Sequence, residues 1–135
     1  LGKRIARVDV RIFYEDTDCG GVVYYANYLK YFERARTDYL EQRGLSVPQL
    51  AKDGTIFMVI RAELDYKSPA RLGETLAIET TFSDNGKAAF LFSHVIREKL
   101  SGRVIVEGSA TLVVTSPDNK VKRADPELLA KLKVR

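Results

Sequence analysis

The order of its periodic segments restricts the fold of this 135-residue chain more than any other feature. Residues 26–43 repeat apolar side chains at three- and four-residue intervals, which is typical of a helix with one buried face. The members of this apolar stripe are Tyr25, Tyr28, Leu29, Phe32, Ala35 and Tyr39. Gly44 is placed to end the helix. The chain therefore contains one long predicted helix, and the other apolar segments are shorter.

Five segments have the pattern of strands. Residues 5–14 alternate apolar and charged side chains, and the predicted inner face consists of Ala6, Val8, Val10, Ile12 and Tyr14. Four more strands are predicted at residues 56–66, 74–83, 87–99 and 103–115. Asp84-Asn-Gly86 and Ser101-Gly102 are hairpin signals. Tight hairpins join antiparallel neighbours, so the sheet is predicted to be antiparallel.

Two shorter helices are also predicted. Ser46-Val-Pro-Gln49 has the form of a capping box, with Ser46 as N-cap, and the helix that it opens should stop at Gly54. Asp125-Pro-Glu127 combines an N-cap residue, a proline at the first helical position and an acidic first turn. A short helix is therefore expected near the end of the chain.

These elements predict an α+β fold in which a five-stranded antiparallel sheet wraps around one long helix. No repeat, low-complexity run or linker divides the chain, so residues 1–135 are expected to form a single domain. One helix covers only one face of the sheet. Because the edges and the far face stay exposed, association through the sheet is expected.

Composition excludes several classes of function. The net charge of +4 lies in residues 120–135, which hold six basic and two acidic side chains, so the charge does not indicate a nucleic-acid binder. The single cysteine, Cys19, excludes a disulfide framework and a zinc finger, and fits a reducing cytosol. No apolar run has the roughly 20 residues that a transmembrane helix needs, and no signal sequence opens the chain.

Familiar catalytic devices are absent as well. The only histidine, His94, lies within a predicted strand and is interpreted as a packed residue, and no Gly-x-Ser-x-Gly elbow is present. Cys19 lies beside carboxylates, which disfavour its thiolate. Asp16-x-Asp18 lacks the later oxygen ligands of a calcium loop. No phosphate-binding or dinucleotide motif occurs, so no metal and no cofactor is expected.

A carboxylate-only site remains. Asp18 lies in a loop with Gly20 and Gly21, and an apolar Val-Val-Tyr-Tyr run connects this loop to the long helix. Glycines permit close approach of a ligand, and the first turn of a helix offers unpaired N–H groups to a developing oxyanion. Asp18 can there activate water or attack directly. From the residues alone, Asp18 can equally be a turn former.

Two motifs resemble a known family. Residues 12–36, which include Tyr14-Glu-Asp-Thr-Asp18-Cys-Gly-Gly-Val-Val-Tyr-Tyr25, closely resemble the signature of the 4-hydroxybenzoyl-CoA thioesterase-like hotdog family. They are most similar to its branch of small acyl-CoA thioesterases associated with the bacterial Tol–Pal envelope system. The segment Tyr66-Lys-Ser-Pro-Ala-Arg-Leu-Gly-Glu74 resembles a family turn between strands. The resemblance implies the hotdog fold and hydrolysis of acyl-CoA thioesters.

The resemblance also implies roles for single residues. Asp18 falls on the catalytic aspartate, and the backbone N–H at or near Tyr25 falls on the oxyanion donor. Gly20 and Gly21 match the loop glycines that admit the thioester, and Val23 follows them toward the substrate. Some members of the branch carry histidine where this chain has Tyr25, so a side-chain role at this position is in doubt.

The same resemblance implies a cleft between two subunits, so a homodimer is expected, and further a tetramer formed by two dimers. Lys67 and Arg71 are candidates for binding the coenzyme phosphates, or are ordinary turn cations. Met58, Val59 and Ile60 line the acyl channel or pack in the core. The expected substrate is an acyl-CoA or an acyl carrier protein ester, in the cytoplasm or at the periphery of the inner membrane.

Two other classes stay open. A non-catalytic hotdog module would bind acyl-CoA or acyl carrier protein without hydrolysing it. A hotdog dehydratase would pair a histidine with a carboxylate, and the Asp18 motif contains no histidine.

Overall fold

The computed structural model describes residues 5–84 and 88–133 of the chain. Its long helix, α1, spans Asn27–Gln42, close to the predicted 26–43. Gly44 follows it with a φ of 75°, in the left-handed region that favours glycine, and the Leu45 N–H donates to the Leu40 carbonyl at 3.0 Å. The predicted end of the helix is confirmed.

The strands form one antiparallel sheet. β1 spans Ala6–Arg11, β2 Ile56–Tyr66, β3 Thr75–Asp84, β4 Ala89–Glu98 and β5 Val104–Thr115. Their order across the sheet is β1-β3-β4-β5-β2, so β1 and β2 form the two ends of this row. A two-residue strand, β6 (Val121–Lys122), pairs with β5 and was not predicted. The predicted five long strands are confirmed.

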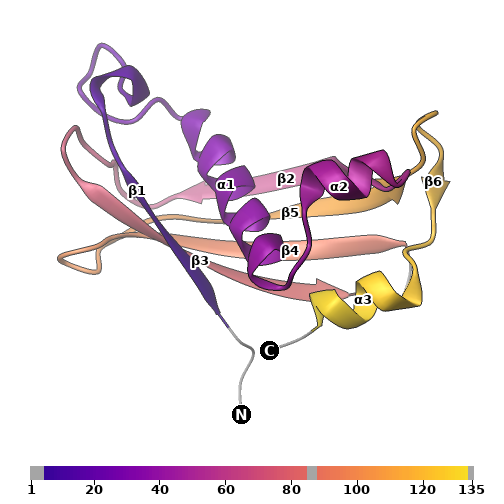
Figure 1. Cartoon of the computed structure of the whole chain (residues 1–135). Helices are drawn as coiled ribbons and strands as arrows, with labels where there is room; N and C mark the ends of the chain where they lie inside the picture. The colour runs from indigo at the N-terminus through magenta and orange to yellow at the C-terminus, as the bar shows by residue number, and fades with distance from the viewer. Residues whose placement is uncertain (1–4, 85–87, 134–135) are drawn as a thin grey trace.

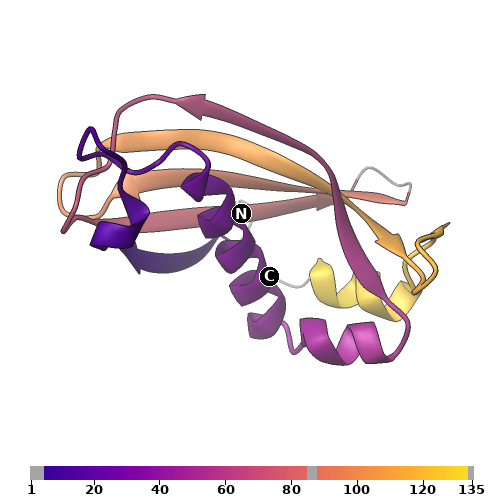
Figure 2. The ribbon, with the colours of Figure 1, turned by 90° about the horizontal axis from the view of Figure 1, so that it is seen from above.

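The three α-helices of the described residues lie on the same side of the sheet (Figure 2), and a short 3-10 helix, η1 (Tyr14–Asp16), lies in the loop before α1. Figure 1 shows α1 crossing the sheet, with the loop that precedes it at one end and α2 and α3 toward the other. α2 spans Val47–Lys52 and α3 spans Pro126–Leu132. None of the helices in the described part of the chain has both the length and the apolar character that crossing a membrane would require.

The helix caps follow the prediction only in part. Ser46 is the N-cap of α2 and accepts from the Gln49 N–H at 3.3 Å, but the Gln49 side chain donates to Asp53 instead of closing the capping box. Asp125 stands at the N-cap of α3 and makes no side-chain capping bond. The predicted Asp84-Asn-Gly86 turn lies outside the described residues, which omit 85–87.

The buried face of α1 is shifted from the predicted stripe. Tyr31 and Phe32 are fully buried, whereas Leu29 is 42% and Tyr25 62% exposed. Phe32 packs so closely on β5 that a Cβ at Gly108 would lie 2.9 Å from its ring carbons, so glycine is required there. Tyr14, predicted on the inner face of the first strand, is 82% exposed because β1 ends at Arg11.

β2 differs most from its predicted role. Its pairing with β5 slips between Val59 and Arg61, so Ile60 is the extra residue of a β-bulge. The slip puts Met58 and Leu64 on opposite faces, although strict alternation predicts one face. Met58, Val59 and Ile60 are 38%, 45% and 58% exposed, so packing in the core of the protomer is excluded for them. β2 is therefore an edge strand with an exposed apolar run at residues 58–60.

Candidate active site

The loop before α1 folds into a small hairpin. Thr17 and Val23 form an isolated antiparallel bridge, and the Asp18 N–H donates to the Val22 carbonyl at 2.9 Å. The Gly21 N–H closes the turn on the Asp18 carbonyl at 3.1 Å, and Gly21 has a φ of 77°. Asp18 and both predicted glycines thus lie at the tip of one hairpin.

The Asp18 carboxylate is exposed and oriented by one bond. Its Oδ1 accepts from the Gly20 N–H at 2.8 Å, and no other hydrogen bond to this carboxylate forms within the described residues. A Cβ at Gly20 would lie 3.2 Å from Oδ1, so glycine lets the carboxylate fold back on the loop. Gly20 therefore orients the Asp18 carboxylate through Oδ1. The other oxygen, Oδ2, is left free to accept a proton or to attack a carbonyl.

The start of α1 supplies the second component of the site. Its N-cap residue, Ala26, makes no side-chain capping bond, and the Asn27 and Leu29 N–H groups of the first turn donate to the Tyr24 and Ala26 carbonyls at 2.8 and 3.2 Å. The Tyr25 N–H has no acceptor among residues 5–84 and 88–133. The positive end of the helix dipole lies at the same place. A carbonyl oxygen that gains negative charge would be stabilised there.

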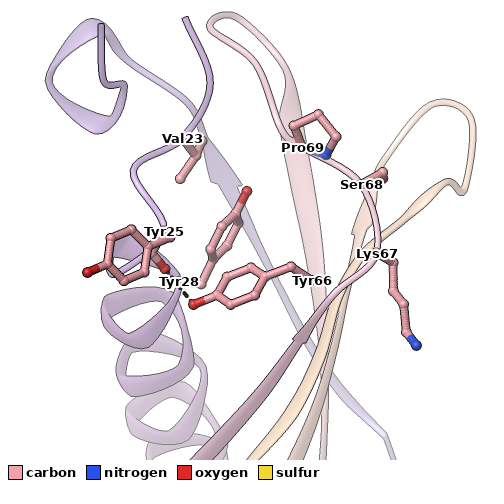
Figure 3. Close-up of a pocket in the computed structure, with 7 residues that line it drawn as sticks. All are labelled: Val23, Tyr25, Tyr28, Tyr66, Lys67, Ser68 and Pro69. Carbon is pink, nitrogen blue, oxygen red and sulfur yellow. Dashed lines mark hydrogen bonds between the residues drawn. The ribbon is translucent and has the colours of Figure 1, made fainter. Parts of the chain in front are cut away.

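A cleft of about 320 Å³ opens between the start of α1 and the end of β2 (Figure 3). It is lined by Val23, Tyr25, Tyr28, Tyr66, Lys67, Ser68 and Pro69. The Tyr66 hydroxyl donates to the Tyr25 carbonyl at 3.1 Å, and the Tyr28 and Tyr66 ring centroids are 5.9 Å apart. The Lys67 ammonium points away from these rings. The cleft is thus aromatic inside, with a cation at its rim.

The two sequence motifs meet at this cleft. The Val23 N–H donates to the Ala70 carbonyl at 2.8 Å, and Val22 forms an isolated bridge with Arg71. The Ala70 N–H in turn donates to the Tyr28 hydroxyl at 3.3 Å. The turn at 67–74 therefore supports the hairpin that carries Asp18. Arg71 takes part through its backbone, and its side chain is not among the groups that line the cleft.

One predicted group lies elsewhere. Met58, Val59 and Ile60 are near the other end of β2, and roughly 20 Å of extended strand separates Ile60 from Tyr66 at ~3.3 Å per residue. Within one protomer these residues do not reach the cleft. Sequence reasoning in turn missed Tyr28, Tyr66, Ser68 and Pro69 as lining residues, because only the pairing of β2 beside α1 brings them there.

Tyrosines also surround the carboxylate. The Tyr24 and Tyr25 ring centroids are 4.9 Å apart. Contact with the Tyr25 hydroxyl raises the pKa of Tyr24, and the negative charge of Asp18 adds to the rise. The Tyr24 phenol therefore stays protonated at neutral pH, near both groups.

His94 takes no part in this site. It is 1% exposed, stacks on Phe32 with centroids 4.4 Å apart, and contacts the Thr80 hydroxyl through Nδ1 at 3.0 Å. Burial, with the charge of Arg36, lowers its pKa to about 3. Its interpretation as a packed residue is confirmed. Cys19 is an exposed free thiol, and the described residues contain no metal-binding cluster of histidine, cysteine and carboxylates.

Comparison with known proteins agrees with the motifs. The family profile of the thioesterase-like superfamily matches residues 13–132. The acyl-CoA thioester hydrolase YbgC of Escherichia coli is 34% identical over 127 residues, 94% of each chain. The acyl-CoA thioesterase YbgC of Haemophilus influenzae is 37% identical over 110 residues, which cover 81% of this chain and 78% of the relative.

Solved structures establish the fold class. A mutant 4-hydroxybenzoyl CoA thioesterase, complexed with 4-hydroxybenzoyl CoA, superposes with a TM-score of 0.87 over 97% of this chain and 99% of its own. At 18% identity this likeness concerns the fold alone. The predicted hotdog fold is confirmed.

Proposed function

The chain belongs to the thioesterase-like superfamily, and from this premise we propose that it hydrolyses acyl-CoA thioesters to the free acid and CoA. One observation carries the proposal: a carboxylate with a free oxygen and the Tyr25 N–H, which has no acceptor among the described residues, flank the same short hairpin beside an open cleft. Hydrolysis of a thioester needs this pair and little else, because the thiolate leaves without a strong general acid.

The proposed chemistry uses Asp18 and the Tyr25 backbone. The Tyr25 N–H donates to the thioester carbonyl oxygen and stabilises the negative charge that develops on it. Asp18 Oδ2 takes a proton from water as the water oxygen attacks the carbonyl carbon, or attacks this carbon itself to form an anhydride that water then opens. In both routes the carbon–sulfur bond breaks and CoA leaves as the thiolate. A backbone donor does not depend on the side chain, so tyrosine in place of histidine does not remove it.

The cleft suggests how the substrate is bound. Its tyrosine rings offer apolar surface to the acyl group or to the pantetheine arm. The Lys67 ammonium at the rim makes no ion pair with a described residue and is suited to the coenzyme phosphates. Arg71, whose backbone pairs with the catalytic hairpin, is the second candidate cation. An acyl carrier protein could present the same arm.

We further propose a homodimer formed through the free edge of β2. This edge exposes an apolar run at residues 58–60 next to the charged Arg61, Glu63 and Asp65, whereas the exposed side chains of β1 at the opposite end of the sheet are Arg7, Asp9 and Arg11. A two-fold axis near the middle of β2 would pair the strands antiparallel. With the axis at Arg61, Met58 of one protomer would lie opposite Leu64 of the partner subunit, two residues from the Tyr66 that lines the partner's cleft, and Val59 and Ile60 would lie closer to the axis. The predicted acyl-channel residues would then act across the interface.

Two such dimers would form the predicted tetramer. A cytoplasmic location is part of the proposal, since an exposed free Cys19 suits a reducing compartment.

A panel of acyl-CoA esters tests the proposed reaction. Purified protein is given short, long and aromatic acyl-CoA substrates, and release of free CoA is followed with a thiol reagent. Turnover of at least one class supports hydrolysis. Tight binding of an ester without turnover would instead identify a binding module, and water addition to an enoyl-CoA would identify a dehydratase.

Labelled water distinguishes the two routes for Asp18. In a single turnover with enzyme in excess, ¹⁸O recovered in the Asp18 carboxylate indicates attack by Asp18 through an anhydride. Label confined to the released acid shows that water attacked the acyl carbon, either of the thioester itself or of an anhydride. Mass spectrometry of the peptide that contains Asp18 gives the answer directly.

A further inference from the structure

A second aspartate lies buried behind the catalytic hairpin. Asp16 is 8% exposed, and its Oδ2 accepts from the Phe13 N–H at 2.8 Å. Its Oδ1 accepts from the side-chain amide of Asn27 at 3.1 Å. Its main-chain carbonyl accepts from the Tyr24 N–H at 2.9 Å. Asp16 therefore joins the end of β1, the base of the hairpin and the first residue of α1.

Asn27 completes this connection from the helix. It is 9% exposed, and its side-chain nitrogen also lies 3.5 Å from the Asp16 carbonyl oxygen. The buried Tyr31 hydroxyl lies beside the pair: burial raises its pKa, and the charge of Asp16 raises it further, so the phenol stays neutral. Two buried polar side chains are thus fixed against each other at the junction of loop and helix.

The positions of the pair in the sequence connect it to the chemistry. Asp16 precedes Asp18 by two residues, and Asn27 follows Tyr25 by two. The hydrogen bond between the Asp16 and Asn27 side chains joins the two ends of residues 16–27. This segment contains both the Asp18 carboxylate and the Tyr25 N–H, the proposed oxyanion donor. No cleft-lining side chain belongs to the pair.

We propose that Asp16 and Asn27 are positioning residues, whose buried hydrogen bond sets the Asp18 carboxylate at its working distance from the Tyr25 N–H. This inference rests on the proposed hydrolase function. A displacement of about 1 Å between reacting groups can lower a rate about 100-fold. Loss of the bond should therefore lower kcat, while KM should change little because the cleft keeps its lining.

The test exchanges the two partners. Asn27→Asp sets two carboxylates against each other and should lower kcat about 100-fold. The double variant Asp16→Asn with Asn27→Asp restores one amide and one carboxylate, and the new amide oxygen at position 16 can still accept from Phe13. It should recover at least about tenfold of the lost kcat. Asp38→Asn, on the same helix but away from the site, is the matched control for loss of a carboxylate and should keep wild-type kcat.

All variants are assayed well below their unfolding temperatures, so that only folded protein is compared. If Asn27→Asp does not fold, Asn27→Ala removes the same bond without adding charge, and the same fall in kcat at nearly unchanged KM is expected. A double variant as slow as Asn27→Asp would overturn the positioning role, as would wild-type kcat in both Asn27 variants. Either result, with an active wild type, leaves the hydrolase proposal standing. An inactive wild type would instead refute the proposed function.

Discussion

Acidification from pH 7 to pH 5 should destabilise this protein through His94. The ring is buried and lacks any hydrogen-bond partner at Nε2 among the described residues. Burial and the nearby charge of Arg36 lower its pKa from 6.5 to about 3. Below pH 6.5 the unfolded chain therefore binds a proton at His94 that the folded protein does not bind. The free energy of unfolding falls as the pH falls from 6.5, and the loss is complete only near pH 3.

The size of the effect follows from the two pKa values. The His94 pKa is 6.5 in the unfolded chain and about 3 in the folded protein. This difference predicts that the free energy of unfolding falls by about 2 kcal/mol between pH 7 and pH 5. Glu79 and Glu98, whose pKa values are also shifted, do not contribute to the loss between pH 7 and pH 5. Hydrogen bonds lower the pKa of Glu79, chiefly from Arg97, and of Glu98, chiefly from the Leu100 N–H. Their stabilisation is present above the ordinary glutamate value of 4.5 and is lost below it.

Urea unfolding at pH 7 and pH 5 measures the loss, with protein concentration held fixed because association also shifts stability. His94→Asn is the matched variant, since asparagine can still contact Thr80 and does not titrate. The variant should be less stable than wild type at pH 7 but nearly independent of pH over this range. The reasoning is refuted if wild type loses less than about 0.5 kcal/mol, or if His94→Asn shows the same slope as wild type.

Three further predictions concern packing, substrate and assembly. Gly108→Ala should lower the unfolding free energy by about 1–3 kcal/mol in urea, because the added methyl meets the Phe32 ring and the Glu63 carbonyl; unchanged stability would contradict the close approach. Lys67→Ala should raise KM for acyl-CoA about tenfold and leave acyl-pantetheine kinetics unchanged; an equal effect on both substrates would exclude a phosphate contact. Ile60→Asp, on the free edge of β2, should shift the proposed dimer to monomer in sedimentation velocity; a variant that stays dimeric would place the interface elsewhere.

The sequence predicted the elements well because their signals are local. The strand predicted at 56–66 is found at those bounds, since alternating residues are enclosed by turn residues at both ends. The short β6 was missed because its turn depends on Asn119, which adopts a φ of 63° after Pro117 and Asp118. The bulge at Ile60 was missed for another reason: it is a property of the pairing with β5, which no single strand reveals.

Local sequence predicted that Asp18 and its glycines share a loop directly before the helix, but it did not predict the residues that line the cleft. The hairpin glycines and the following helix identify Asp18 from local sequence. By contrast, Tyr66 reaches the Tyr25 carbonyl across 41 positions of the chain, so its place in the cleft depends on the tertiary fold. The burial of Asp16 and its contact with Asn27 were not predicted, because both depend on the tertiary fold.

The central claim is that the Asp18 carboxylate performs thioester hydrolysis, and comparison of kcat for Asp18→Asn with wild type tests it most directly. Asp38→Asn serves as the control, and affinity for a non-hydrolysable CoA thioether shows whether the cleft is intact. We expect a kcat lower by about 10²- to 10⁴-fold with nearly unchanged affinity. An Asp18→Asn variant that turns over acyl-CoA at the wild-type rate would contradict it.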